Sequence, residues 1–344
     1  MARACRPATV LVPALMLALA LAACAPAAPR PEDLAPLVWP EVPNRPRIAF
    51  VREFSRPEEF GIAKGFFKRL AEVIFGAEES RLVRPMAVVA ANGVVYVADP
   101  GANGVHRFDP KAERYDLIGA EGDAALPSPV GLARGSEGEI YVTDSDLGKV
   151  LVIRPGAKAA VPLALPDMGQ PTGIAFEPAT RRLYVVDTTA HRVNIFDQDG
   201  TLASSFGARG VGDGEFNYPT LLWRDSQGRL YVTDSLNFRV QIFDAQGRFL
   251  GKFGGAGDGA GDNMRPKGIA TDSYGHVYVT DSLLNALQVF DQRGRYLLSV
   301  GSMGRDRGEF WLPAGIFIGE DDTIYIADSY NQRVQVLRYI GGPT

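Results

Sequence analysis

The sequence YVTDSLNFRVQIFD at residues 231–244 returns with small changes as YIADSYNQRVQVL at residues 325–337. Each copy has a β-branched and aromatic run, a polar loop that starts at Asp, and a second apolar run. Two such runs around a short polar loop predict a pair of antiparallel strands. The core motif, Tyr-[Val/Ile]-x-Asp, occurs six times and ends at Asp99, Asp144, Asp187, Asp234, Asp281 and Asp328. Consecutive motifs lie 45, 43, 47, 47 and 47 residues apart.

Two further markers keep register with this motif. A proline opens an apolar run before each copy, at Pro85, Pro129, Pro171, Pro219, Pro266 and Pro313. Six residues after each Asp stands Val105, Val150, Val193, Val240, Leu287 or Val334. Each unit then holds four short strand-like runs, at the period of a propeller blade. The sequence therefore predicts an all-β, six-bladed β-propeller of four-stranded blades over residues 85–344.

The last copy ends one run short, after residue 339. Residues 47–54 are left over at the other end of the chain, and they alternate like a fourth strand. We expect this segment to complete the sixth blade, which joins the two ends of the chain and removes an exposed sheet edge.

Over residues 85–340 the pattern resembles the NHL-repeat family, most closely in the last three copies. The resemblance implies a six-bladed propeller. Ligand sites in such folds usually lie on the face that carries the loops after each Tyr-x-x-Asp and the joins between blades, here called the top face. The second copy departs most, since Leu147 and Gly148 replace the Asn region and Arg154 replaces the usual Asp.

The N-terminus is expected to direct the chain to the cell envelope. Residues 1–23 carry Arg3 and Arg6 before an apolar, uncharged run, which is typical of a secretory signal peptide. Their end, Leu-Ala-Ala-Cys at residues 21–24, resembles a bacterial lipobox, which implies that Cys24 is lipidated. An ordinary signal peptide with a chance cysteine is the alternative. We expect a membrane-anchored lipoprotein on the periplasmic or extracytoplasmic side, with residues 24–46 as a Pro-rich tether that forms neither helix nor sheet.

Residues 55–84 are expected to form a helical insertion. Apolar and charged side chains alternate at helical spacing from residue 60 to 75, which predicts one amphipathic helix. Packing on the domain is the favoured interpretation, and lying on a lipid surface is the alternative. The face opposite the top face is the bottom face. If the tether enters the sixth blade's outer strand from the bottom face, that face of the propeller is turned toward the membrane.

Charge and cysteine content exclude several functions. The net charge of −4 provides no basic field, so nucleic acid is not an expected partner. Cys5 leaves with the signal peptide and Cys24 carries lipid, so the mature chain keeps no thiol for a disulfide or a catalytic cysteine.

Side chains at the top of the predicted channel follow from the repeat. One residue after each marker proline stand Met86, Val130, Thr172, Thr220, Lys267 and Ala314, with no carboxylate or His among them. The three histidines occupy different blade positions. We therefore predict no catalytic residue, no metal and no cofactor. The six Asp are expected to accept hydrogen bonds from loop amides. Candidate top-face binding residues are Thr172, Thr220, Lys267, Asn237, Arg239, Asn285, Asn331 and Arg333, although bracing of the loops is the favoured role of the Asn and Arg residues.

The sequence thus favours a lipid-anchored, monomeric scaffold that binds a protein or a cell-envelope polymer through its top face. The alternative is a metal-dependent hydrolase, lactonase or lyase with a site at the channel mouth that uses Lys267 together with Arg224 or nearby Asp residues.

Overall fold

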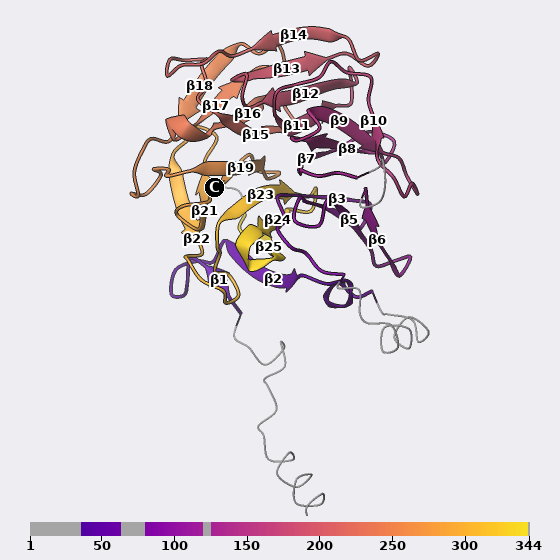
Figure 1. Cartoon of the computed structure of the whole chain (residues 1–344). Helices are drawn as coiled ribbons and strands as arrows, with labels where there is room; N and C mark the ends of the chain where they lie inside the picture. The colour runs from indigo at the N-terminus through magenta and orange to yellow at the C-terminus, as the bar shows by residue number, and fades with distance from the viewer. Residues whose placement is uncertain (1–35, 63–79, 120–124, 343–344) are drawn as a thin grey trace, which may run out of the picture. The chain divides into compact units, whose positions relative to one another are not determined.

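The structure, a computed structural model, describes residues 36–62, 80–119 and 125–342 (Figure 1). Within these residues the strands form six antiparallel sheets. The first sheet contains β3 (Ala87–Ala91), β4 (Val94–Asp99), β5 (Gly104–Asp109) and β6 (Arg114–Ile118). The second contains β7 (Pro129–Arg134), β8 (Ile140–Asp144), β9 (Lys149–Ile153) and β10 (Val161–Pro162). The third contains β11 (Pro171–Glu177), β12 (Arg182–Asp187), β13 (Arg192–Phe196) and β14 (Leu202–Phe206).

The fourth sheet contains β15 (Pro219–Arg224), β16 (Leu230–Asp234), β17 (Arg239–Phe243) and β18 (Phe249–Phe253), and the fifth contains β19 (Pro266–Thr271), β20 (Val277–Asp281), β21 (Ala286–Phe290) and β22 (Tyr296–Val300). The sixth contains β23 (Pro313–Ile318), β24 (Thr323–Asp328) and β25 (Arg333–Tyr339), together with β2 (Ile48–Phe54) and β1 (Val38–Trp39) from the N-terminal part of the chain. The innermost strands contact one another in the closed order β3, β7, β11, β15, β19, β23 and back to β3. The prediction of a six-bladed propeller is confirmed.

The sixth sheet combines the two ends of the described chain. β2 pairs antiparallel with β25, with Ile48 opposite Tyr339 and Phe54 opposite Val334. Figure 1 shows the indigo β2 beside the yellow β25. Residues 48–54 thus supply the fourth strand that the last repeat lacks, in the place where the sequence leads us to expect residues 47–54.

A fifth strand on this sheet corrects the expectation for residues 24–46. In the described part of that segment β1 pairs with β2, with Val38 opposite Ala49 and Trp39 opposite Ile48. The Arg47 amide donates to the Trp39 carbonyl at 2.7 Å. Proline is tolerated on an edge strand, so the neighbouring Pro36 and Pro40 do not prevent this pairing. β1 is antiparallel to β2 and pairs with its first two residues, so the described chain reaches β2 along the outer edge of the sheet. The membrane-facing orientation of the bottom stays a prediction.

Other N-terminal predictions lie outside the described residues. These are the signal peptide at 1–23, the lipidation site Cys24 and nearly all of the helix expected over residues 60–75. The described part of the insertion holds a short 3-10 helix at Pro57–Phe60, ended by Gly61 in the left-handed region at φ 90°. No helix of the described residues is long and apolar enough to cross a membrane.

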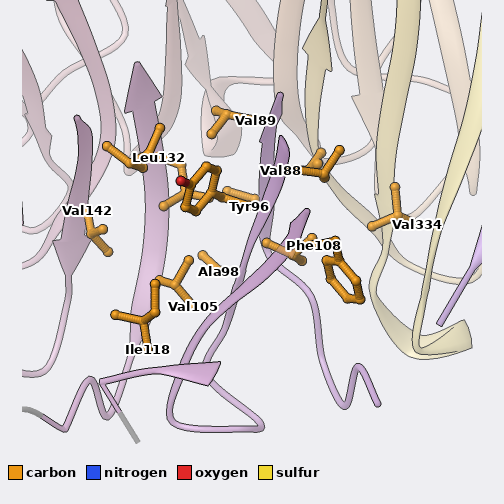
Figure 2. Close-up of a cluster of buried hydrophobic side chains, with 14 of the residues drawn as sticks. Val88, Val89, Tyr96, Ala98, Val105, Phe108, Ile118, Leu132, Val142 and Val334 are labelled. Atoms are coloured by element: carbon orange, nitrogen blue, oxygen red, sulfur yellow. The ribbon is translucent and has the colours of Figure 1, made fainter. Parts of the chain in front are cut away.

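Apolar side chains of adjacent blades form the core. Figure 2 shows Val88 of β3 with Leu132 of β7 on one side and Val334 of β25 on the other, so sheets six, one and two share one cluster. Phe108 and Ile118 in this cluster have no exposed surface. Each fully buried side chain of this size stabilises the fold by about 1.5–3 kcal/mol. Packing between blades therefore fixes the positions of the loops.

Threonine hydroxyls join the blades near the top of the ring. The residue before the motif Asp is threonine in three blades, and each hydroxyl donates to a carbonyl on the innermost strand of the next blade. Thr143 donates to the Thr172 carbonyl, Thr233 to the Lys267 carbonyl and Thr280 to the Ala314 carbonyl. These bonds hold the start of each innermost strand, where the candidate residues lie, in a fixed position relative to its neighbour.

Candidate functional site: a cationic pocket on the top face

The strand order places the loops of interest on one face. Each innermost strand begins at its marker proline, and each second strand returns antiparallel to it and ends at the motif Asp. The joins before the prolines and the loops after the Asp residues therefore share the top face. The turns between strands one and two, and between strands three and four, share the opposite, bottom face.

The six motif Asp residues organise the top-face loops, as predicted. Each accepts a backbone N–H from the join that precedes its own blade; for Asp281 the donors are Met264 at 2.8 Å and Arg265. The other five amides belong to Val83, Ser128, Gln170, Asn217 and Trp311. Burial raises the pKa of Asp99, but hydrogen bonds from His106 and from two amides outweigh it and lower the pKa overall. These carboxylates are structural.

The arginines and asparagines chosen from the sequence brace the same loops. Arg239 is 7% exposed; its Nε donates to Asp234 at 2.8 Å and its other nitrogens donate to the carbonyls of Val211, Gly212 and Glu215. Arg333 makes the equivalent bonds in blade six, to Asp328 and to the carbonyls of Arg305, Asp306 and Glu309, and adds a 2.8 Å contact to Glu53 of β2. The guanidinium groups of both arginines therefore donate their hydrogen bonds to other groups of the protein.

The asparagines follow the same rule. Asn237 donates to Asp234 and to the Gly210 carbonyl, both at 2.9 Å. Asn331 donates to Asp328 at 2.9 Å and to the Gly304 carbonyl at 2.8 Å. Asn285 has a left-handed backbone at φ 53°, and its side-chain oxygen accepts the Leu312 amide at 2.8 Å. These contacts agree with loop bracing, the favoured role of the Asn and Arg residues.

The two threonines of the predicted mouth are also engaged within the protein. Thr172 donates to the Thr220 carbonyl at 2.7 Å and lies 2.8 Å from the Thr188 hydroxyl. The Thr220 hydroxyl lies 2.9 Å from that of Thr233 and 3.0 Å from that of Ser235. The Thr172 hydroxyl therefore links blade three to blade four, whereas the Thr220 hydroxyl makes its contacts within blade four.

Lys267 is different, because it lines an open pocket at the top of the ring. The pocket has a volume of about 350 Å³ and lies among blades five, six, one and two. Two more cations line it, Arg84 and Arg265, each directly before a marker proline. The other lining side chains come from Met86, Pro100, Ser128, Val130, Ser282, Leu283, Leu312, Ser329 and Tyr330. We call this the cationic pocket.

The cationic pocket lacks a counter-charge among the described residues. None of its lining residues is acidic, and no described carboxylate forms an ion pair with Arg84, Arg265 or Lys267. Burial lowers the pKa of Lys267, and the positive charges of Arg265 and Arg84 lower it further. Both effects disfavour the protonated amine, and the negative charge of an anion in the pocket offsets them.

Two serines add hydroxyl donors to the pocket. The residue after the motif Asp donates to the next blade's proline carbonyl in blades two, three and four, through Ser145, Thr188 and Ser235. Ser282 and Ser329 depart from this pattern. Among the described residues, the Ser282 hydroxyl makes only a 3.3 Å contact to the Arg265 carbonyl, and the Ser329 hydroxyl only a 3.8 Å contact to the Met86 sulfur. A hydroxyl with so weak a partner can turn toward a ligand.

Arg224, the proposed companion of Lys267 in the enzymatic alternative, lies in a different cavity. It ends β15 on the bottom face and lines a cavity of about 510 Å³, to which all six innermost strands contribute apolar residues. Arg224 pairs there with Glu177, and Arg134 pairs with Glu320 at 3.6 Å. Since Lys267 stands near the start of its strand and Arg224 at the end of its own, the two do not share a site. That pairing is wrong.

The histidines and carboxylates form no common centre in the part of the chain that the structure describes. His106 lies near Asp99 and Tyr115, His191 accepts the Tyr218 amide, and His276 contacts Asp272. Within the same residues no group of three or more His, Cys, Asp or Glu side chains is placed to hold a metal ion.

Sequence reasoning found Lys267 but missed Arg84 and Arg265. Both arginines stand one position before a marker proline, whereas only the position after it was expected to line the mouth. The same register position in the other blades carries Ser128, Gln170, Tyr218 and Leu312. The signal was thus present in the repeat, and reading this second position would have found the cation pair.

Comparison with known proteins supports the fold. A family model described as a six-bladed β-propeller matches residues 220–276 and 271–339. No curated protein matches the sequence.

Three solved structures illustrate the likeness. An auxiliary nutrient binding protein from Bacteroides thetaiotaomicron VPI-5482 has a TM-score of 0.61 and 13% identity, over 77% of this chain and 71% of the other. A gluconolactonase from Xanthomonas campestris has a TM-score of 0.58 and 12% identity, over 75% and 86%. A streptogramin B lyase has a TM-score of 0.56 and 16% identity, over 75% and 94%. At these identities the likeness concerns the fold.

Proposed function

We propose that this protein is a binding scaffold of the cell envelope whose top face recognises an anionic group on a protein or an envelope polymer. The observation that carries the proposal is the cationic pocket, a cavity lined by Arg84, Arg265 and Lys267 and by no acidic residue. Holding three like charges together is unfavourable in the unliganded protein. A carboxylate, phosphate or sulfate group relieves this repulsion.

The donors in the pocket suit such a group. Guanidinium groups can bind an oxyanion through two parallel hydrogen bonds, and charge-assisted hydrogen bonds are about twice as strong as neutral ones. Lys267 adds a point charge, while Ser282 and Ser329 can donate from their hydroxyls. The top-face loops are held by buried Asp and Arg residues, so the backbone that carries the donors is positioned before a ligand arrives, which reduces the ordering cost of binding.

A second candidate function, metal-dependent hydrolysis or lyase chemistry at the channel mouth, draws on the fold likeness to a lyase and a gluconolactonase. Because a shared fold does not by itself imply a shared activity, this candidate function requires a metal-binding catalytic site at the channel mouth. Elemental analysis that finds a tightly bound divalent metal in the purified protein would favour it over the binding role.

The substitution Lys267→Met tests the binding role. It removes the positive charge of the pocket's most enclosed cation and keeps a side chain of similar length. We expect affinity for fluorescently labelled polyglutamate, measured by anisotropy, to fall about tenfold, which corresponds to about 1.4 kcal/mol. Lys252→Met is the matched control, since Lys252 lies on the outermost strand β18 and pairs with Asp213 at 2.5 Å. Equal affinity losses in the two variants would contradict the proposal.

The pH dependence of binding gives a second readout of the same experiment. A bound anion stabilises the protonated amine and raises the lowered pKa of Lys267, so binding is linked to proton uptake. While the glutamates stay ionised, affinity is constant below the pKa of Lys267 in the free protein. It declines as pH rises through that pKa, which lies below the ordinary value of 10.5. This decline should vanish in Lys267→Met and persist in Lys252→Met.

We also propose that lipid on Cys24 anchors the protein, which rests on the lipobox-like sequence at residues 21–24. Cells grown with radiolabelled palmitate should yield labelled protein in the membrane fraction. Cys24→Ser should abolish the label and the membrane association. Cys5→Ser is the matched control and should change neither. Label that survives Cys24→Ser would refute this anchor.

A further inference from the structure

Large apolar side chains gather on the top face. Nine of the 17 exposed large apolar side chains of the described residues lie in the top-face joins and loops. They are Val83, Leu147, Val211, Tyr218, Leu236, Met264, Leu283, Met303 and Tyr330. Exposed apolar surface concentrated on one face of a soluble domain marks an interaction site.

Part of this apolar surface lies at the cationic pocket itself. Leu283 and Tyr330 line the pocket and are 46% and 53% exposed. They occupy the same loop position in blades five and six, two residues after Asp281 and Asp328. The Tyr330 ring lies 5.8 Å from that of Trp311, and the Arg305 guanidinium lies 4.9 Å from the Trp311 ring. An aromatic and cationic rim thus adjoins the pocket.

The composition of this rim indicates what kind of ligand it fits. Protein interfaces are enriched in Tyr, Trp, Met and Arg and depleted of acidic residues and lysine at their centres. A polysaccharide would present hydroxyl groups to Leu283 and Met264, which offer no hydrogen-bond partner. A polypeptide can present apolar side chains to the rim and a carboxylate to the cations. Charge complementarity with the cations and apolar contact with the rim therefore both favour a polypeptide as the partner.

We propose that the top face binds a polypeptide segment in which a carboxylate is flanked by large apolar side chains. The carboxylate enters the cationic pocket beside Lys267, and the flanking side chains pack on Leu283 and Tyr330. This inference rests on the proposed function, because it takes the cationic pocket as the anion site and adds the apolar rim as the determinant of partner class.

The test compares four probes on the full-length protein in detergent. The first is a peptide library with a central glutamate flanked by leucine, phenylalanine and tryptophan. The second replaces the glutamate with glutamine, the third replaces the flanking residues with serine, and the fourth is the acidic polysaccharide alginate. We expect the first library to bind at least about tenfold more tightly than each of the others, the size of one well-placed contact.

The outcomes separate the inference from the proposed function. Equal binding of the serine-flanked peptides or of alginate overturns the inference and leaves anion recognition intact. Equal binding of the glutamine peptides overturns both, since the charge then contributes nothing. Absence of binding by all four probes also overturns both.

Two variants locate the effect on the rim. Leu283→Ser should weaken the first library about fivefold or more and weaken the serine-flanked peptides by a smaller factor. Leu297→Ser is the matched control, because Leu297 belongs to the same blade and is 40% exposed but lies on the outer strand β22. If Leu297→Ser weakens binding as much as Leu283→Ser does, the rim is not the contact and the inference is wrong.

Discussion

Replacing Phe54 with alanine is expected to lower the free energy of unfolding by about 3–5 kcal/mol, the range for large-to-small changes at buried aromatic positions. Phe54 ends β2 and has no exposed surface. Its ring lies 4.6 Å from that of Phe60 and 5.2 Å from that of Phe108, a residue of the first blade. The substitution therefore opens a cavity where the N-terminal strand meets the sheets on either side of the closure. Guanidinium unfolding followed by tryptophan fluorescence measures the change.

Val51→Ala is the control for this prediction. Val51 belongs to the same strand and is 47% exposed, so its truncation removes little buried surface. We expect a change within about 0.5 kcal/mol, as for most surface substitutions. A Phe54→Ala variant as stable as Val51→Ala would mean that β2 contributes little to closing the ring.

The substitution Asp234→Ala is expected to be comparably severe. Asp234 has no exposed surface and accepts hydrogen bonds from the Asn217 amide and from the side chains of Asn237, Arg239 and Gln241. Its loss leaves the Arg239 guanidinium buried without a counter-charge. Removing one partner of a buried ion pair typically costs about 3–5 kcal/mol. Urea unfolding measures this cost, and hydrogen exchange should rise in the join over residues 207–216, whose carbonyls Arg239 binds.

Asp213→Ala provides the comparison. Asp213 also pairs with a cation, Lys252, but both side chains are about half exposed. An exposed ion pair contributes about 0–1 kcal/mol. If the two Asp variants lost equal stability, burial would not be what gives the Asp234 network its strength.

The repeat predicts much of this architecture because its markers have direct structural meaning. The marker prolines begin the innermost strands, and the motif Asp residues end the second strands, so register alone places the top face. The fourth strand from residues 48–54 follows from counting the runs in the last copy. The Asp roles follow from the chemistry of a carboxylate at the start of a polar loop.

What the repeat misses depends on contacts between distant segments. β1 forms because Val38 and Trp39 find a free edge on β2 and because Trp39 packs onto the cluster that includes Ile48. Val38 and Trp39 are residue types that strands favour, but the prolines around them predict an extended tether and hide this signal. Similarly, Arg84 and Lys267 belong to different blades, and only ring closure brings them into one pocket. Side chains of different blades that share one pocket can be predicted only when equivalent positions of several repeats are compared around the ring.

The pairing of β2 with β25 also imposes an order of events during synthesis. Glu53 and Arg333, which meet across this seam, are separated by 280 residues along the chain. The edge of β2 that faces β25 must wait unpaired until β25 has been made, and such long-range pairing slows folding. A chain terminated before residue 333 retains an open edge at each end of its set of sheets, which favours association with other chains or degradation. Synthesis of β25 thus acts as a checkpoint for the native state.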